Sequence, residues 1–369
     1  MPERVDIVNF GAGPSALPTS ILEEAAKGLL NYRNTGIGLT ELSHRSKEFG
    51  TLTKHLESLI REQLEVPSNY HIAFTQGGGS GQFSAVVLNL LARHRLLNPN
   101  VTDEERVMDY VVTGSWSKKA SEEAKRLGGG KVNVVVDGRT YSKTGKAFDN
   151  IPPHDKWAFS PKPAFVYYCE NETVDGVQFS HEEGSAQAFP FHLTDPSVPI
   201  VADYSSSFMS RPIPRLKDHA LIYAGAQKNI GPSGLTILII RDDLLVDTDA
   251  AAKLGAAPVP ITLVYKTLAD SGSLYNTPPM FPMYVSELVL ERMKNSGGLQ
   301  RLEEANRRKA TLLYDTLDEA EKKGLVKVKV QPGSKSWMNA TFELVGEGAE
   351  QKFLEGAEAK GFKQLKGHR

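Results

Sequence analysis

Residues 223–240 read YAGAQKNIGPSGLTILII and place a lysine between two segments of buried type. Small residues lead to Lys228, a Gly/Pro turn follows, and the stretch ends in a run of apolar residues typical of a buried strand. A buried lysine is costly unless its charge is paired or lost. A surface lysine on a loop is the simpler interpretation, and the rest of the chain decides between the two.

Apolar runs of strand length alternate with helical patterns over the first three quarters of the chain. Several runs are apolar throughout, which is typical of strands buried on both faces of a parallel sheet. The sequence therefore predicts an α/β domain with a mostly parallel mixed sheet. The runs are HIAFTQ (71–76), DYVVTG (109–114), KVNVVV (131–136), AFVYYC (164–169), VPIVAD (198–203), ALIYAG (220–225) and LTILII (235–240).

Two smaller local patterns carry expectations. Ser20 and Glu23 have the spacing of a capping box for a helix that starts near residue 21. The segment 245–262 has the composition of a loop and is expected to be an insertion.

The pattern changes from about residue 284. Two long amphipathic helical stretches, 285–298 and 299–324, precede alternating strands on either side of a Pro-Gly turn and a further helix at 349–361. We expect a smaller C-terminal α+β domain. The expected division is a large domain of residues 18–283 and a small domain of residues 1–17 and 284–369.

Composition excludes several classes of function. Lys and Arg total 43 against 44 Asp and Glu, so the chain has no basic surface for nucleic acid and no polybasic attraction to membranes. No apolar run approaches the ~18 residues of a membrane helix. One cysteine, Cys169, excludes a disulfide framework and a cysteine-based zinc cluster, and no metal site is expected. We expect a cytoplasmic protein.

A glycine-rich stretch follows the first apolar run. In residues 72–91, IAFTQGGGSGQFSAVVLNLL, a strand leads through glycines into a helix. Free N–H groups at a helix N-terminus bind anions, so Gly78, Gly79 and Ser80 form a candidate phosphate cradle. The stretch is neither a P-loop nor a dinucleotide fingerprint, since Gln82 stands at the third glycine position. A tight turn without a ligand is an equally good interpretation.

Asp203 ends the apolar run 198–203, where α/β sheets bind ligands, although a helix cap or surface turn explains it as well. The stretch between it and the strand that delivers Lys228 leaves room for a short helix, so the two side chains could reach one pocket from neighbouring strand ends. Pyridoxal phosphate needs a phosphate cradle, a carboxylate to keep its ring nitrogen protonated and a lysine for its aldehyde. Trp116, just after another strand, is a candidate to stack on the ring, with a plain core tryptophan as the alternative.

Nine stretches, in order along nearly the whole chain, resemble the phosphoserine aminotransferases: NFGAGPSALP, ELSHRSKEF, GGGSGQF, DYVVTGSWSKKA, YYCENETVDGV, ADYSSSF, AGAQKNIGPSGLT, SLYNTPP and LKGHR. This resemblance implies the fold-type I architecture of pyridoxal-phosphate enzymes. It also implies a homodimer with active sites at the subunit interface.

The resemblance also implies roles for single residues. Lys228 would carry the internal aldimine and move the proton between Cα and the cofactor, and Asp203 would pair with the pyridinium nitrogen. The further implied cofactor contacts are Trp116 on the ring, Thr173 near its hydroxyl, Gly79, Ser80 and Gln227 at the phosphate, and Asn276 and Thr277 at the phosphate from the other subunit. The implied substrate-phosphate ligands are His44, Arg45, His368 and Arg369, and arginine and histidine suit that anion.

Two departures from the family pattern matter. Some members have arginine where this chain has Ser80, so phosphate recognition here would depend more on the four histidines and arginines just named. Family members also continue beyond Gly-His-Arg with a segment that carries an arginine for the substrate carboxylate. We therefore expect a protein that ends at Arg369 to bind the cofactor but to handle substrate poorly.

The implied reaction belongs to L-serine biosynthesis. It converts 3-phosphohydroxypyruvate and L-glutamate into O-phospho-L-serine and 2-oxoglutarate by a ping-pong transamination. A related aminotransferase for a non-phosphorylated substrate, such as alanine or serine with glyoxylate, is the second hypothesis. A catalytically silent nucleotide- or phosphate-binding protein is the third, and it would have no cofactor-linked lysine.

Overall fold

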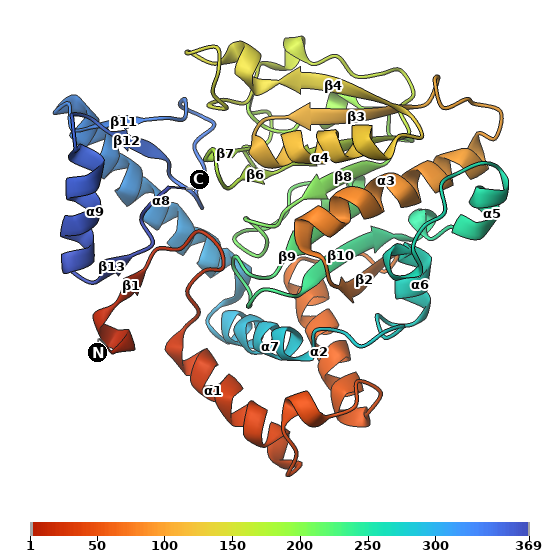
Figure 1. Cartoon of the computed structure of the whole chain (residues 1–369), viewed down its shortest axis with the longest axis horizontal. Coiled ribbons are helices and arrows are strands. Elements are labelled where there is room, and N and C mark those ends of the chain that lie inside the picture. Colours follow the sequence, from red (N-terminus) through yellow and green to blue (C-terminus); the bar gives the residue numbers. More distant parts are fainter. Residues whose placement is uncertain (1–2, 368–369) are drawn as a thin grey trace.

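A seven-stranded sheet forms the centre of the chain in the computed structural model, which describes residues 3–367 (Figure 1). The strands lie in the order β2-β10-β9-β8-β5-β3-β4, and only β10 runs antiparallel to its neighbours. Each strand coincides with one of the seven apolar runs, so the predicted fold class is confirmed. Their bounds are β2 (Tyr70–Thr75), β3 (Val107–Val112), β4 (Lys131–Asp137), β5 (Phe165–Cys169), β8 (Ile200–Asp203), β9 (Leu221–Gly225) and β10 (Thr236–Arg241).

Both faces of the sheet are covered, which explains why the strands are apolar throughout. In β5, Phe165 and Tyr167 pack into one core and Val166 and Tyr168 into the other, because successive side chains point to opposite faces. The first core contains residues of α3 (Gly78–Leu97), α4 (Ser115–Leu127) and α6 (Tyr265–Asp270). The second contains residues of α1 (Thr19–Leu30), α2 (Lys47–Gln63) and α7 (Met280–Asn295).

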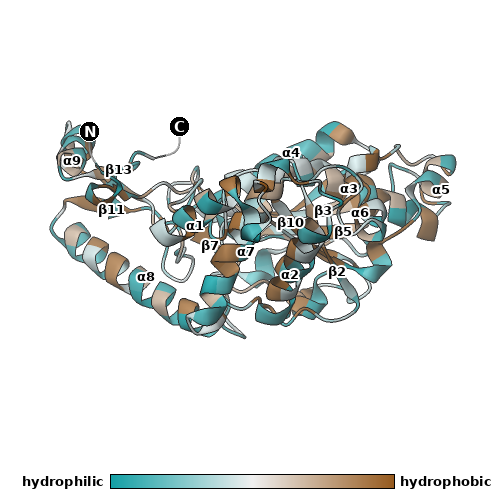
Figure 2. Ribbon diagram, turned by 90° about the horizontal axis from the view of Figure 1, so that it is seen from below, coloured by the Kyte–Doolittle hydropathy of each residue, from teal (hydrophilic) through white to brown (hydrophobic). Residues whose placement is uncertain are grey.

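A smaller part lies to one side of the sheet. The long helix α8 (Gly298–Lys322) leads away from the main body toward it and gives the molecule an elongated outline (Figure 2). This part contains two two-stranded sheets and a helix. The antiparallel pair is β11 (Val326–Val328) with β12 (Phe342–Leu344), the parallel pair is β1 (Val8–Asn9) with β13 (Phe362–Lys363), and the helix is α9 (Ala349–Ala359).

The capping box was a wrong prediction, and two other segments differ locally from what the sequence suggested. Helix α1 begins at Thr19 with no side-chain cap, so Ser20 lies inside it and its hydroxyl accepts a hydrogen bond from Arg292 instead. The connection from β8 to β9 has no α-helix, only a 3₁₀ turn at Leu216–Asp218. The segment 245–262 contains a short helix, α5 (Thr248–Lys253), whose first turn is capped by Asp247.

No helix in the described part of the chain is both long and apolar enough to traverse a lipid bilayer.

Candidate active site

Five parallel strands end at one edge of the sheet, and the candidate residues lie just after these ends. Strand β2 is followed by the glycine loop, β3 by Trp116, β5 by Thr173, and β9 by Lys228, while β8 ends at Asp203 itself. The carboxyl edge of an open parallel sheet is where ligands bind. The topology therefore brings together residues more than a hundred positions apart in the sequence.

Asp203 is buried at the centre of this edge. Its backbone is in register with Cys169 of β5 and Tyr223 of β9, and 4% of the residue is exposed. Burial raises the pKa of the Asp203 carboxyl, whereas hydrogen bonding by Ser205, whose N–H donates to Oδ1 at 2.8 Å, opposes that rise. The charge of Lys228 also lowers this pKa, so the two side chains interact electrostatically.

Lys228 is half-buried in the turn between β9 and β10. Burial lowers its pKa, and the charge of Asp203 acts in the opposite direction. The Nζ atom donates to the carbonyl oxygen of Ala12 at 3.0 Å, and a Cβ atom at Gly13 would overlap the lysine side chain. The N-terminal segment therefore closes one side of the lysine, and Ser15 N–H adds a hydrogen bond to the Gln227 carbonyl at 2.9 Å.

The glycine loop begins α3 beside the aspartate. Gly77 has φ +99° and caps the helix without a side chain, and Gly78 N–H donates to Thr236 Oγ1 at 2.9 Å. A Cβ atom placed on Gly79 would lie 3.7 Å from Asp203 Oδ2, so the helix start adjoins the carboxylate. The N–H groups of Gly79 and Ser80 have no hydrogen-bond acceptor among residues 3–367, which leaves them available to an anion.

Trp116 lies in the first turn of α4. Its indole is half-buried, and Lys119 Nζ lies 4.5 Å from the ring centroid. The N–H groups of this turn are all used, because Glu172 accepts from Trp116 and Ser117, and Asp175 accepts from Ser115. Of the two helix starts at this edge, only that of α3 can receive a phosphate.

A second group of predicted residues gathers beside Gln76, the residue that precedes the glycine loop. Thr277 Oγ1 lies 3.3 Å from His44 Nδ1, and Gln76 Nε2 donates to the Thr277 carbonyl at 3.2 Å. Asn276 and Arg45 are exposed. No hydrogen bond joins this group to Lys228 or Asp203 within the described chain. His368 and Arg369 lie outside the described residues.

Three contacts at the site were not found from the sequence. Ser205 Oγ accepts from Gly225 N–H at 3.1 Å and so ties β8 to β9, Thr236 holds the glycine loop, and Glu172 caps α4. Ser205 stands two residues after Asp203, the spacing of an Asx turn, which could have signalled the bond from Ser205 N–H to the Asp203 carboxylate but not the bond from Gly225. The partners of Thr236 and Glu172 are distant in sequence and left no local signal.

The residues present fit pyridoxal phosphate. The α3 start offers unpaired N–H donors, a buried carboxylate faces the same space, and a lysine with a lowered pKa completes it. No three His, Cys, Asp or Glu side chains within residues 3–367 are arranged to hold a metal ion. This fold and this site define the class of the chain, a fold-type I α/β enzyme of the kind that carries pyridoxal phosphate.

Comparison with known proteins agrees with this class. The Aminotransferase class-V family profile matches residues 7–361. The chain is 41% identical over 361 residues to the phosphoserine aminotransferase of Pseudomonas aeruginosa, covering 98% of this chain and 89% of that one. The solved phosphoserine aminotransferase of Bacillus circulans has a TM-score of 0.84 and 36% identity, with 98% and 89% covered.

A pyridoxal-phosphate-bound phosphoserine aminotransferase from Trichomonas vaginalis has a TM-score of 0.81 and 34% identity, with 98% of this chain and 92% of that chain covered. The chain belongs to the aminotransferase class-V family and, within it, to the phosphoserine aminotransferase group.

Proposed function

We propose that the chain transfers the amino group of L-glutamate to 3-phosphohydroxypyruvate and forms O-phospho-L-serine and 2-oxoglutarate, a step of L-serine biosynthesis. The observation that carries this proposal is the meeting of Lys228, Asp203 and the unpaired N–H groups of α3 at one sheet edge. The identity to phosphoserine aminotransferases supports the substrate class.

Each residue at this edge would have a defined task. The N–H groups of Gly79 and Ser80, with Gln227, would hold the cofactor phosphate, and Trp116 would cover the ring and exclude water. Asp203 would keep the ring nitrogen protonated. When bound, the cofactor supplies an electron sink for the electrons left at the substrate Cα.

Lys228 would act as the base. Its lowered pKa increases the fraction of neutral amine, and a neutral Nζ can take the proton from the substrate Cα and later return one. The hydrogen bond to Ala12 would keep Nζ on the side of the site closed by the N-terminal segment.

The assembly and the domain division also belong to this proposal. We infer a cytoplasmic homodimer in which Asn276 and Thr277 reach the partner's cofactor phosphate and Thr173 lies near the ring hydroxyl. His44, Arg45, His368 and Arg369 would bind the substrate phosphate. The joint exposure of Asn276 and Arg45 beside the Thr277–His44 contact supports a shared outward role. Residues 18–283 would form the large domain and residues 1–17 with 284–369 the small one.

The test is a visible absorption spectrum of the protein with pyridoxal phosphate, followed by titration with amino acids. We expect a band that O-phosphoserine bleaches and serine does not, and borohydride should fix the cofactor to the peptide that contains Lys228. Lys217→Ala, at an exposed lysine, should leave the band unchanged, whereas Lys228→Ala should remove it. Equal bleaching by serine would favour the aminotransferase for a non-phosphorylated substrate, and a protein without any band would contradict both.

A further inference from the structure

Two carboxylates hold the first turn of α4, from which the indole of Trp116 projects. Glu172 Oε2 accepts from Trp116 N–H at 2.8 Å and Oε1 from Ser117 N–H at 2.9 Å. Asp175 Oδ2 accepts from Ser115 N–H at 2.7 Å. Three consecutive N–H groups of the helix start are thus fixed by one short segment, residues 172–175.

The segment is a tight hairpin that leaves β5. It joins β6 (Asn171–Glu172) to β7 (Val177–Gln178), and these two strands pair antiparallel. Thr173, the residue expected near the ring hydroxyl, lies directly between the two carboxylates in sequence. The hairpin therefore sets the place of Thr173 and of the α4 start at the same time.

The glycine at position 114 leaves the space that the side chain of Glu172, the larger of the two acids, occupies. Glu172 is fully buried, and a Cβ atom at Gly114 would overlap its carboxyl group. Gly114 has an extended backbone, φ −168°, that any residue could adopt, so the glycine is required by space and not by conformation. The hydroxyl of Ser117 accepts the N–H groups of Thr113 and Gly114 at 3.0 and 3.1 Å and fixes the approach to the helix.

Capping a helix with the buried carboxyl group of Glu172 costs free energy, because burial disfavours the charged form of the group. Burial raises its pKa to about 7, against the effect of its hydrogen bonds to Ser117 and Trp116 and with the charge of Asp175 acting in the same direction as burial. A serine or threonine cap would satisfy the same N–H groups without a buried acid. Two acceptor oxygens at fixed separation, however, define the direction of the helix start more tightly than one hydroxyl can.

We propose that Glu172 and Asp175 are positioning residues that fix Trp116 for stacking on the cofactor ring, an inference that rests on the proposed function. They act through the α4 backbone and do not touch the cofactor. Because the carboxylates also occupy the N–H groups of α4, they direct the cofactor phosphate to α3.

A double-mutant cycle on cofactor affinity tests this role. Cofactor-free protein is titrated with pyridoxal phosphate in four forms: unchanged, Glu172→Gln, Trp116→Ala and the double variant. Glutamine keeps one acceptor oxygen and turns a donor toward the other N–H, so Glu172→Gln should weaken binding by about tenfold. In the Trp116→Ala background the same change should cost less than about twofold, because the ring that it positions is gone. Glu122→Gln, on the exposed face of α4, is the matched control and should change nothing.

The outcomes separate the two proposals. If Glu172→Gln weakens binding by the same factor in both backgrounds, or not at all, the positioning role is overturned. If Glu172→Gln does not fold, the cycle is run with Asp175→Asn, at a partly exposed residue of the same cap, with the same criterion. If the unchanged protein binds no pyridoxal phosphate, the proposed function fails and this inference with it.

Discussion

Asp203, Lys228 and His219 each have a pKa displaced toward the uncharged form, because burial penalises the charge. In the first two the opposite charge of the neighbour limits the displacement. Burial lowers the pKa of His219 to about 4, although hydrogen bonding to the backbone of Arg215 and Leu216 and the charge of Asp218 act in the opposite direction. Tyr168 Oη lies 2.7 Å from its Nε2, and its Nδ1 lies 3.2 Å from the Arg215 carbonyl, so Nδ1 carries the proton and Nε2 accepts.

His219 should make the protein sensitive to acid. Its folded-state pKa lies below the unfolded value of 6.5, so the unfolded chain takes up the proton first, and stability is lost as the pH falls from about 6.5 to about 4. The loss is on the order of 3 kcal/mol for a shift of this size. Urea unfolding at pH 7 and pH 4.5 should show a shallower pH dependence for His219→Gln than for the unchanged protein. His192→Gln, at an exposed histidine, should keep the original dependence; an unaltered slope in His219→Gln would contradict the prediction.

At the scale of elements, two glycines at the start of α3 serve different purposes, one for folding and one for ligand binding. Gly77 requires its glycine because φ +99° is unfavourable for other residues. Gly79 has an ordinary helical position, and its missing Cβ leaves space beside Asp203 and Ser205. Glycine is therefore needed at position 77 for its backbone conformation and at position 79 for the space that it leaves.

Alanine should therefore affect stability at one of these positions and cofactor binding at the other. Gly77→Ala should lower the unfolding free energy by roughly 1–2 kcal/mol through backbone strain. Gly79→Ala should leave stability within about 0.5 kcal/mol, since alanine favours helix and the contact is an ordinary one, but should weaken cofactor binding. Thermal unfolding and cofactor titration of both variants measure the two effects. A Gly79→Ala protein with full cofactor affinity would show that the space beside Asp203 is not needed.

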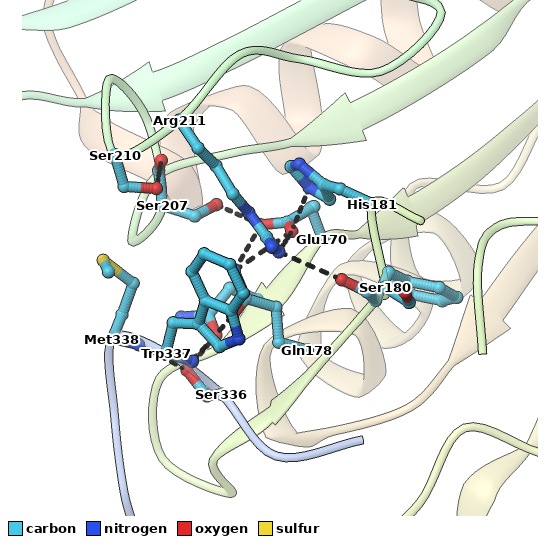
Figure 3. A network of polar contacts seen from close by, with 12 residues as sticks. Glu170, Gln178, Ser180, His181, Ser207, Ser210, Arg211, Ser336, Trp337 and Met338 are labelled. Atoms are coloured by element: carbon cyan, nitrogen blue, oxygen red, sulfur yellow. Dashed lines mark hydrogen bonds and ion pairs between the residues drawn. The ribbon is translucent and has the colours of Figure 1, made fainter. Parts of the chain in front are cut away.

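A buried ion pair joins Glu170, which follows β5, to Arg211 in the connection from β8 to β9, and Arg211 also contacts the segment that follows β11 (Figure 3). Arg211 pairs with Glu170 at 3.4 Å, donates to the Phe179 carbonyl at 3.2 Å and stacks on Trp337, with its guanidinium carbon 4.4 Å from the ring centroid. Glu170 also binds His181 at 2.8 Å, and these contacts lower its pKa although burial alone would raise it. The buried charge of Glu170 is compensated by all of these contacts together and not by any single one.

Removing Arg211 should therefore be costly. Arg211→Ala leaves the Glu170 carboxylate buried without its arginine partner, and the expected loss of stability is about 3–5 kcal/mol. Arg126→Ala removes an exposed i, i+3 pair with Glu123 on α4 and should cost less than about 1 kcal/mol. Thermal unfolding of both variants provides the comparison. Similar midpoints for the two would mean that the network contributes nothing beyond a surface pair.

At the scale of the whole molecule, the proposed dimer predicts complementation between inactive chains. If Asn276 and Thr277 act in the partner's site, a mixed dimer of Lys228→Ala with the Asn276→Ala/Thr277→Ala chain contains one site with all of its residues intact. Random exchange of subunits should then restore up to about a quarter of the original activity per site. Turnover is measured after mixing and refolding the two variants, with each refolded alone as the control. A mixture no more active than its components would place both sets of residues in the same chain's site.

The glycine loop and Lys228 could be recognised from the sequence because their signals are local. Glycines between a strand and a helix, and a lysine after an apolar run, depend on neighbours within a few residues. The same holds for the seven strands, whose apolar runs follow from burial on both faces. By contrast, the capping box at Ser20 failed because its hydroxyl accepts from Arg292, more than 270 residues away.

The sequence by itself determined the α/β class, the strand positions and the residue types that suit pyridoxal phosphate, because hydrophobic periodicity and turn chemistry are written into short stretches. Only the tertiary structure decided which of two helix starts is open to a phosphate, since the carboxylates that occupy α4 come from a hairpin beyond β5. It also decided that Lys228 lies against the N-terminal segment and interacts with Asp203. Pairings of this kind depend on the order of strands in the sheet, and a parallel sheet joins residues that no local pattern relates.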